Sequence, residues 1–238
     1  MSANLMSLAR SGGKFLKLFG DRKMMKQLPY DAEVEWLENG DGAFLKTGVS
    51  IGVDSEINLE FKYSAPYVSG YPYWKLCYGF RNRNAQGGQG KSQFQINYNY
   101  LDKMIALDAS DATSENTTAV TADEFHDVKG VISENLSASL YVDGLLVFTR
   151  KISLIIPDEV WLFRSNDTHA ESSSKRSQRT SVKKARIVSM GSVLFDAIPV
   201  RFTNENGVSE GAMYDRVSGN LFRNAGTSSF VIGPDKTI

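Results

Sequence analysis

The chain has 238 residues, of which 42% are hydrophobic and 11% aromatic, enough to bury a sizeable core in one large domain or two small ones. Its 27 basic and 27 acidic side chains cancel, which excludes a bulk electrostatic attraction to nucleic acid or to an anionic membrane, although local charged patches are still allowed. The single cysteine, Cys77, excludes an intramolecular disulfide, and no apolar run reaches the roughly 18 residues that a membrane-spanning helix needs.

Residues 1–28 differ in composition from the rest of the chain. They carry six basic side chains against one acid, and their apolar residues recur near helical spacing. This pattern predicts a short basic amphipathic helix. We expect this N-terminal arm either to anchor the protein to a partner or to pack on its own domain, with attachment to a lipid surface ranked below both. The candidate anchor residues are Lys14, Phe15, Lys17, Leu18 and Phe19.

The arm does not have the pattern of a secretion signal. Its most apolar piece, KFLKLFG, is interrupted by Lys17, and no small-residue cleavage site follows an apolar core. We therefore expect the protein to be made in the cytoplasm without a signal peptide.

From residue 29 onward the dominant period of apolar residues is two, which predicts one domain over 29–238. Alternation of this kind is typical of antiparallel strands that bury one face. The clearest alternating series are Ile57, Leu59 and Phe61; Trp74, Leu76, Tyr78 and Phe80; Phe94, Ile96 and Tyr98; and Leu136, Ala138, Leu140 and Val142.

Turn signals separate these series. Asp143–Gly144 lies between two apolar runs and predicts a two-residue hairpin, because such turns need positive φ. Polar residues dominate 108–123 and 165–181, which we predict to be surface loops. Many short strands with frequent turns and no sustained helical period after the arm predict an all-β sandwich or barrel.

Three segments carry a resemblance to a known superfamily. Residues 125–153 contain Phe125–His126–Asp127–Val128 followed by the phrase LYVDG, residues 183–202 end in the phrase IPVRF, and residues 211–235 read GAMYDRVSGNLFRNAGTSSFVIGPD. These phrases resemble concanavalin A-like and laminin-G-like domains of the kind found in phage structural proteins and gut-bacterial surface proteins. The resemblance covers roughly residues 30–235 and implies a two-sheet antiparallel β-sandwich, the jelly roll.

The resemblance also implies a function and a location. We expect a non-catalytic module located in a virion, as a tail or capsid accessory protein, that binds a glycan, a cell-surface receptor or another protein. The arm would then join it to other virion proteins in an assembly that holds several copies. A carbohydrate-binding protein of the bacterial cell surface is the alternative. Nucleic acid is not expected as a partner, and a membrane is disfavoured.

The final hairpin is expected to have a structural role. We predict that Met213–Tyr214 and Leu221–Phe222 bring the C-terminal strands back beside the N-terminal strand and cover an edge of the sandwich. Asp215 and Gly219 would then form the turn between them.

The clearest candidate for an enzymatic site is the phrase EVEWLE. Its carboxylates, Glu33, Glu35 and Glu38, resemble the E-x-D-x-x-E strand motif of concanavalin A-like glucanases, in which two acids perform retaining hydrolysis. The middle residue is Glu instead of Asp, and the motif opens the domain instead of lying mid-chain. Alternation would also place Ala32, Val34 and Trp36 inside and the acids in solvent. We therefore predict no catalytic residues and keep a glycoside hydrolase as the alternative.

The segment from residue 63 to 84 is the most promising binding surface. Tyr67, Tyr71 and Tyr73 lie in a loop broken by Pro and Gly, and aromatic rings pack well on the apolar faces of sugars. Arg81 and Asn82 would supply hydrogen bonds. The alternative is that the tyrosines cover the edge of the core with their hydroxyls in water.

No cofactor or metal is predicted. His126 and His169 are the only histidines, so neither a zinc site nor a nucleophile–histidine pair is supported, and His126 is expected to be packed or hydrogen-bonded. Many laminin-G domains hold calcium, but the acids at hand show no diagnostic spacing. These acids are Asp54, Asp108, Asp111 and Asp167.

A cluster of basic residues lies between positions 175 and 184. A solvated loop is its expected role, and binding of an anionic glycan or a virion partner is the alternative. Its members are Lys175, Arg176, Arg179, Lys183 and Lys184.

Overall fold

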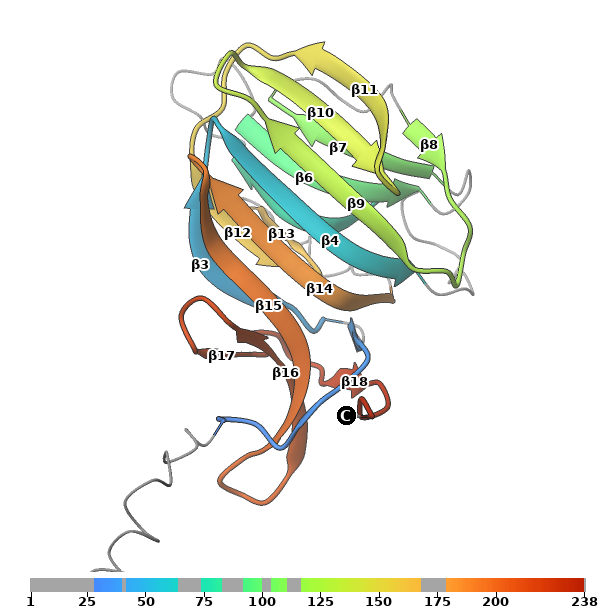
Figure 1. The fold of residues 1–238 in the computed structure, drawn as a ribbon, viewed down its shortest axis with the longest axis vertical. Helices are drawn as coiled ribbons and strands as arrows, with labels where there is room; N and C mark the ends of the chain where they lie inside the picture. The colour runs from blue at the N-terminus through green and yellow to red at the C-terminus, as the bar shows by residue number, and fades with distance from the viewer. Residues whose placement is uncertain are drawn as a thin grey trace, which may run out of the picture.

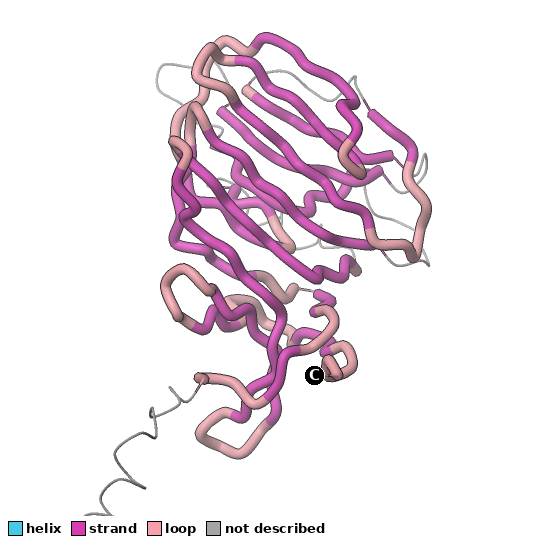
Figure 2. Tube along the Cα trace, in the orientation of Figure 1, coloured by secondary structure: helices cyan, strands magenta, loops and turns pink. Residues whose placement is uncertain are grey.

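The structure is a computed structural model of the chain. It describes residues 28–39, 42–63, 74–82, 92–99, 104–110, 117–167 and 179–237, and for 74–77, 81–82, 99, 117, 165 and 167 it describes the backbone alone. These residues form strands, turns and loops and include no helix, as Figure 2 shows by colour. Within them, no helix is long and apolar enough to cross a membrane. The helix predicted for the arm lies outside the described residues.

Two sheets stack face to face, which confirms the predicted all-β sandwich (Figure 1). The large sheet has the order β11-β10-β9-β4-β14-β15-β16-β17. Their bounds are Leu145–Lys151, Ser137–Val142, His126–Ile132, Ser55–Tyr63, Thr180–Ser189, Ser192–Thr203, Ser209–Asp215 and Leu221–Arg223. Three short strands complete it: β1 (Ala32–Glu33) pairs with β15, and β2 (Leu37–Asn39) pairs with β14 and with β18 (Phe230–Ile232).

The small sheet has the order β3-β12-β5-β6-β7-β8. Their bounds are Leu45–Ile51, Asp158–Leu162, Trp74–Asn82, Ser92–Asn99, Met104–Ala109 and Thr117–Ala119. A short strand, β13 (Ser165–Asp167), pairs with β5 and is parallel to it, whereas every other pair among the described strands is antiparallel.

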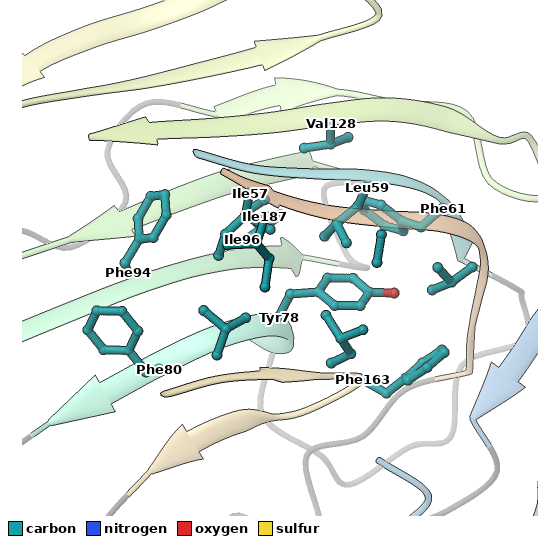
Figure 3. Packing of buried hydrophobic residues seen from close by; sticks show 14 of the residues in the cluster. Ile57, Leu59, Phe61, Tyr78, Phe80, Phe94, Ile96, Val128, Phe163 and Ile187 are labelled. Atoms are coloured by element: carbon teal, nitrogen blue, oxygen red, sulfur yellow. The ribbon is translucent and has the colours of Figure 1, made fainter. Parts of the chain in front are cut away.

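The core lies between the sheets and follows the predicted alternation. In β4 every second side chain is buried, and Ile57, Leu59 and Phe61 meet Tyr78 and Phe80 of the opposite sheet (Figure 3). Burial of each such side chain stabilises the fold by about 1.5–3 kcal/mol. The same figure shows further members of the cluster: Phe94, Ile96, Val128, Phe163 and Ile187.

The C-terminal segments form a smaller unit below the sandwich (Figure 1). β15 runs out of the main body and pairs with β16, and a second apolar cluster gathers there. This cluster consists of Ile198, Val200, Phe202 and Ala212, packed against Tyr30, Tyr214 and Leu221.

The predicted final hairpin is present, but its neighbours differ from the prediction. Met213 pairs with Phe222 and Tyr214 with Leu221, so β16 and β17 form the hairpin. The strands beside the N-terminal segment are instead β15, which pairs with β1, and β18, which pairs with β2. The reason is the length of β15: its second half reaches past the sandwich, and the hairpin follows it there.

Asp215 has the predicted role in the turn. Its buried carboxylate accepts hydrogen bonds from the backbone N–H of Asp196 (2.8 Å), Val217 (3.1 Å) and Ser218 (3.0 Å). Gly219 has a φ of 74°, a conformation that glycine adopts without steric cost.

The two predicted loops, 108–123 and 165–181, include residues that belong to strands in the structure. Residues 108–109 still belong to β7, residues 117–119 form β8, and residues 165–167 and 180–181 belong to β13 and β14. Strand pairing overrides the polar composition here, since Thr117 and Thr118 pair with Ala106 and Ile105 at the edge of the small sheet.

Candidate functional site

A row of amide side chains on β6 faces away from the core. Phe94, Ile96 and Tyr98 point between the sheets, so the alternate residues lie on the opposite face of the small sheet. Gln93, Gln95 and Asn97 occupy that face, yet their exposed fractions are only 0–1%. Buried polar side chains on the second face of a strand need hydrogen-bond partners, because each unpaired group costs about 1–3 kcal/mol.

The amides are only partly paired. Gln95 Nε2 donates to Gln93 Oε1 at 3.4 Å, and Asn97 Nδ2 donates to Asp108 Oδ2 on β7 at 2.6 Å. The carbonyl oxygens Gln95 Oε1 and Asn97 Oδ1 are buried and accept no hydrogen bond from the residues that the structure describes. We call Gln93, Gln95, Asn97 and Asp108 the polar ladder. Buried acceptors of this kind normally have a donor, so these two amide oxygens need an explanation.

The pairing of neighbouring strands continues this row of residues across the small sheet. Trp161 on β12 pairs with Gly79 on β5, Gly79 with Gln95, and Gln95 with Asp108. At about 4.8 Å per strand, Trp161 and Gln95 lie about 10 Å apart, with glycine between them. Only glycine fits there: its φ is 125°, and a Cβ would come within 2.0 Å of the Phe94 carbonyl oxygen.

The ring of Trp161 is in contact with other side chains of the protein. Its ring stacks on Phe44 with centroids 5.0 Å apart, and Lys46 Nζ lies 5.0 Å from the ring centroid. Its indole N–H is buried and donates no hydrogen bond to the described part of the chain. The row therefore contains one buried donor and two buried acceptors that have no hydrogen-bond partner among the described residues.

The charges near the row are of both signs, which favours a ligand with no net charge. Asp108 contributes a carboxylate on β7, whereas Lys46 Nζ and the Arg164 guanidinium carbon lie 5.0 and 5.9 Å from the ring centroid of Trp161. Hydroxyl groups both donate and accept hydrogen bonds, so they can satisfy the amide oxygens and the indole N–H together.

Two of the residues predicted from the sequence lie next to the ladder. Arg81 pairs with Gln93 and Asn82 with Ser92 in the β5–β6 ladder. The side chains of Arg81 and Asn82, and the whole of Tyr67, Tyr71 and Tyr73, lie outside what the structure describes. So do the anchor candidates Lys14, Phe15, Lys17, Leu18 and Phe19.

Sequence reasoning missed the polar ladder. Gln93, Gln95 and Asn97 alternate with Phe94, Ile96 and Tyr98, and the polar positions of an alternating strand normally face water. The one available signal was their type: three amides in a row with no charged residue among them.

The three acids of EVEWLE, Glu33, Glu35 and Glu38, lie in different surroundings. Glu33 accepts a hydrogen bond from Tyr30 at 3.4 Å and pairs with Lys236 at 3.5 Å. Glu38 is 8% exposed and accepts a hydrogen bond from the Ser181 hydroxyl at 3.1 Å. The chain bends at Glu35, between β1 and β2.

That bend also corrects the predicted alternation. Val34 is buried as expected, but the next fully buried side chain is Leu37, three positions on, while Ala32 and Trp36 are half-buried. A continuous strand through this segment was the wrong prediction, because Val34 pairs with Asp235 while Leu37 pairs with Val182 and Ile232.

His126 joins β9 to the hairpin turn of β10 and β11. Its Nδ1 lies 2.8 Å from Asp143 Oδ2, and its Nε2 lies 3.2 Å from the Thr121 hydroxyl. Asp143 and Gly144 both have positive φ, as the predicted two-residue turn requires.

Among the described residues no three His, Cys, Asp or Glu side chains gather as metal ligands. Of the calcium candidates, Asp54 precedes β4 in the large sheet and Asp108 lies in β7 of the small one. Asp111 and the side chain of Asp167 lie outside the description.

Comparison with known proteins gives structural neighbours alone. No protein-family model matches the sequence, and no curated protein matches it. Domains LG4–5 of the mouse laminin α1 chain align with a TM-score of 0.49 and 14% identity, over 88% of this chain and 48% of that one. An endo-β-1,3-glucanase from Pyrococcus furiosus aligns at 0.41 and 11%, over 61% and 65%. Carbohydrate-binding module CBM66 from Bacillus subtilis aligns at 0.39 and 12%, over 66% and 92%.

The aligned region covers less than two thirds of the laminin and glucanase chains. All three TM-scores lie below 0.5, so the likeness does not extend to the function of any of these proteins.

Proposed function

We propose that the protein is a non-catalytic β-sandwich module that binds a neutral, hydroxyl-rich ligand, a glycan, on the polar ladder. The observation that carries the proposal is the set of buried orphan groups, Gln95 Oε1, Asn97 Oδ1 and Trp161 Nε1. A protein retains such groups at a cost in stability, and a ligand whose hydroxyls pair with them recovers that cost on binding.

The test is direct binding by the full chain. We would screen neutral β-glucan, xylan and chitin oligosaccharides and measure the strongest by calorimetry. The double variant Gln95→Leu/Asn97→Leu removes both acceptors, and it should lose at least tenfold in affinity. Asn58→Leu, an amide on the outer face of β4, is the matched control and should change affinity less than twofold. Equal affinity of the double variant and the parent would refute the site.

A non-catalytic role fits the separate engagement of the three acids. A retaining hydrolase needs two carboxyls about 5–5.5 Å apart across the scissile bond. Here Glu33 is paired with Lys236, and Glu38 is buried against Ser181. Glu33→Gln/Glu35→Gln should therefore leave any glycan turnover at the background level of the parent. Turnover by the parent that this variant abolishes would establish the hydrolase instead.

We further propose that the module is part of a virion and joins other virion proteins through residues 1–28. The support is the sequence resemblance of the closing segment, residues 211–235, to phage structural proteins, together with the basic composition of the arm. Removal of residues 1–28 should abolish incorporation into particles and leave glycan binding intact. Normal incorporation without the arm would refute the anchor, and recovery of the protein on bacterial cells in place of particles would favour the surface-protein alternative.

A further inference from the structure

A hollow lies on the large sheet, where the sandwich meets the C-terminal unit. Its volume is about 470 Å³, within the range of roughly 300–1,000 Å³ that small-molecule sites occupy. Four cationic side chains line it: Lys183, Lys184, Arg216 and Lys236. We call it the basic hollow.

The cations reach the hollow from three separate segments. Lys183 and Lys184 come from β14, Arg216 follows β16, and Lys236 lies in the C-terminal tail. Two acids, Glu35 and Glu60, also line it. Two further acids outside the lining pair with its cations: Glu33 with Lys236 at 3.5 Å and Asp196 with Arg216 at 2.7 Å.

A β-bulge explains why two consecutive lysines lie on one face. Val182 pairs with Phe61 and Lys184 pairs with Glu60, so Lys183 is an extra residue in β14 that has no partner position on β4. Both lysines thus line the same hollow instead of alternating across the sheet. Lys183 pairs with Glu60 at 3.4 Å, whereas Lys184 has no acid within ion-pair distance among the described residues.

The cations are held in place before any ligand arrives. Lys183 Nζ lies 4.0 Å from the ring centroid of Phe125, and Arg216 donates to Asp196 at 2.7 Å. Lys236 follows Asp235, which pairs with Arg201 at 2.6 Å. Hydrogen bonding to the Arg201 guanidinium lowers the pKa of Asp235, so the tail stays tied to β15 through neutral pH. Positions fixed in this way reduce the entropy lost on binding.

Charge is segregated across this face of the large sheet. Asp127 on β9 lies opposite Glu60, and Asp143 is near. Burial and the repulsion of these two acids raise the pKa of Asp127, which indicates that negative charge concentrates on the β9 side. Lys184, the partner of Glu60 on β14, partly offsets this negative charge and lowers the pKa of Asp127. Glu60 itself lines the hollow, so a bound anion would contact the cations on the β14 side of Glu60.

We infer that the basic hollow binds an oxyanion-bearing ligand, one that carries sulfate, phosphate or carboxylate groups. Lys184, which is in no ion pair with a described residue, supplies the charge that attracts the anion. Lys236 and Arg216, each held by an acid, would add charge-assisted hydrogen bonds from their remaining N–H groups. Ile198, nearly buried, forms an apolar part of the wall against which the ligand's carbon skeleton would pack. This inference is independent of the proposed function, because the polar ladder lies on the other sheet and favours neutral ligands.

The test is an NMR titration of the full chain with inorganic sulfate, inorganic phosphate, a sulfated tetrasaccharide and its unsulfated counterpart. We expect saturable shifts of the backbone amides of Lys184 and Arg216 with the anions and none with the unsulfated sugar. The two inorganic ions and the sulfated sugar distinguish which anionic group is preferred.

Variants distinguish a site from general charge attraction. Lys184→Gln/Lys236→Gln should weaken anion binding at least tenfold. Lys129→Gln/Lys151→Gln removes the same net charge outside the hollow and should weaken it less than twofold. An equal loss in both variants, or no saturable binding by the parent, would overturn the inference. Loss of anion binding with unchanged binding of neutral glycans would support it and leave the polar ladder unaffected.

Discussion

Substitution of Gln95 by leucine should make the protein more stable and less able to bind. Gln95 is 0% exposed, and its buried Oε1 accepts no hydrogen bond, at a cost of about 1–3 kcal/mol. Its Nε2 makes one long bond to Gln93 at 3.4 Å, whose loss costs roughly 0.5–1 kcal/mol. Leucine has a similar volume and no polar atom, so the net effect should be a gain of about 1 kcal/mol in the free energy of unfolding.

A gain of that size should raise the melting temperature by about 2–4 °C in a chain of this length. Urea denaturation would show it as a higher midpoint with an unchanged slope. Calorimetry with the strongest neutral oligosaccharide should show at least a tenfold loss of affinity, about 1.4 kcal/mol, in the same variant. A variant that is less stable than the parent by 1 kcal/mol or more would refute the reasoning, because Gln95 would then be a satisfied structural residue.

Three further predictions concern the scaffold. Gly79→Ala should destabilise the fold by at least about 3 kcal/mol in urea denaturation, because the new Cβ would meet the Phe94 carbonyl oxygen at 2.0 Å; a neutral result would mean that β5 shifts freely. Asp215→Ala should cost roughly 3 kcal/mol, since the backbone N–H groups at the turn lose their acceptor; an unchanged melting temperature would contradict this. Asp127→Asn should stabilise the protein slightly at pH 7, by less than about 1 kcal/mol because the side chain is exposed. Its raised pKa means that the native state binds the proton more tightly than the unfolded chain does, so the advantage of Asn should vanish as the pH falls below that pKa; an advantage that grows on acidification would show the opposite shift.

The alternation in the sequence was sufficient to predict the sandwich. Ile57, Leu59 and Phe61 on β4, and Phe94 and Ile96 on β6, face the core as their spacing required. This succeeds because the two-residue period of a strand is a local property, set by the backbone alone. The Asp143–Gly144 hairpin and the Asp215 turn were predictable for the same reason, since both depend on a few consecutive residues.

The state of the opposite faces was not predictable. Glu60 on β4 and Gln95 on β6 hold equivalent polar positions in alternating strands, yet Glu60 is partly exposed and Gln95 is fully buried. Alternation separates the two faces of a strand, but it contains no information on what lies over the second face.

Convergence from distant segments was decided by the tertiary structure alone. Lys184, Arg216 and Lys236 meet at one hollow because β15 leaves the sandwich and the tail returns to pair with Val34. Likewise, the acids of EVEWLE separate because the chain bends at Glu35 to join two sets of partners. The sequence determined the strands and their inward faces through local geometry, whereas long-range pairing decided which polar residues became neighbours.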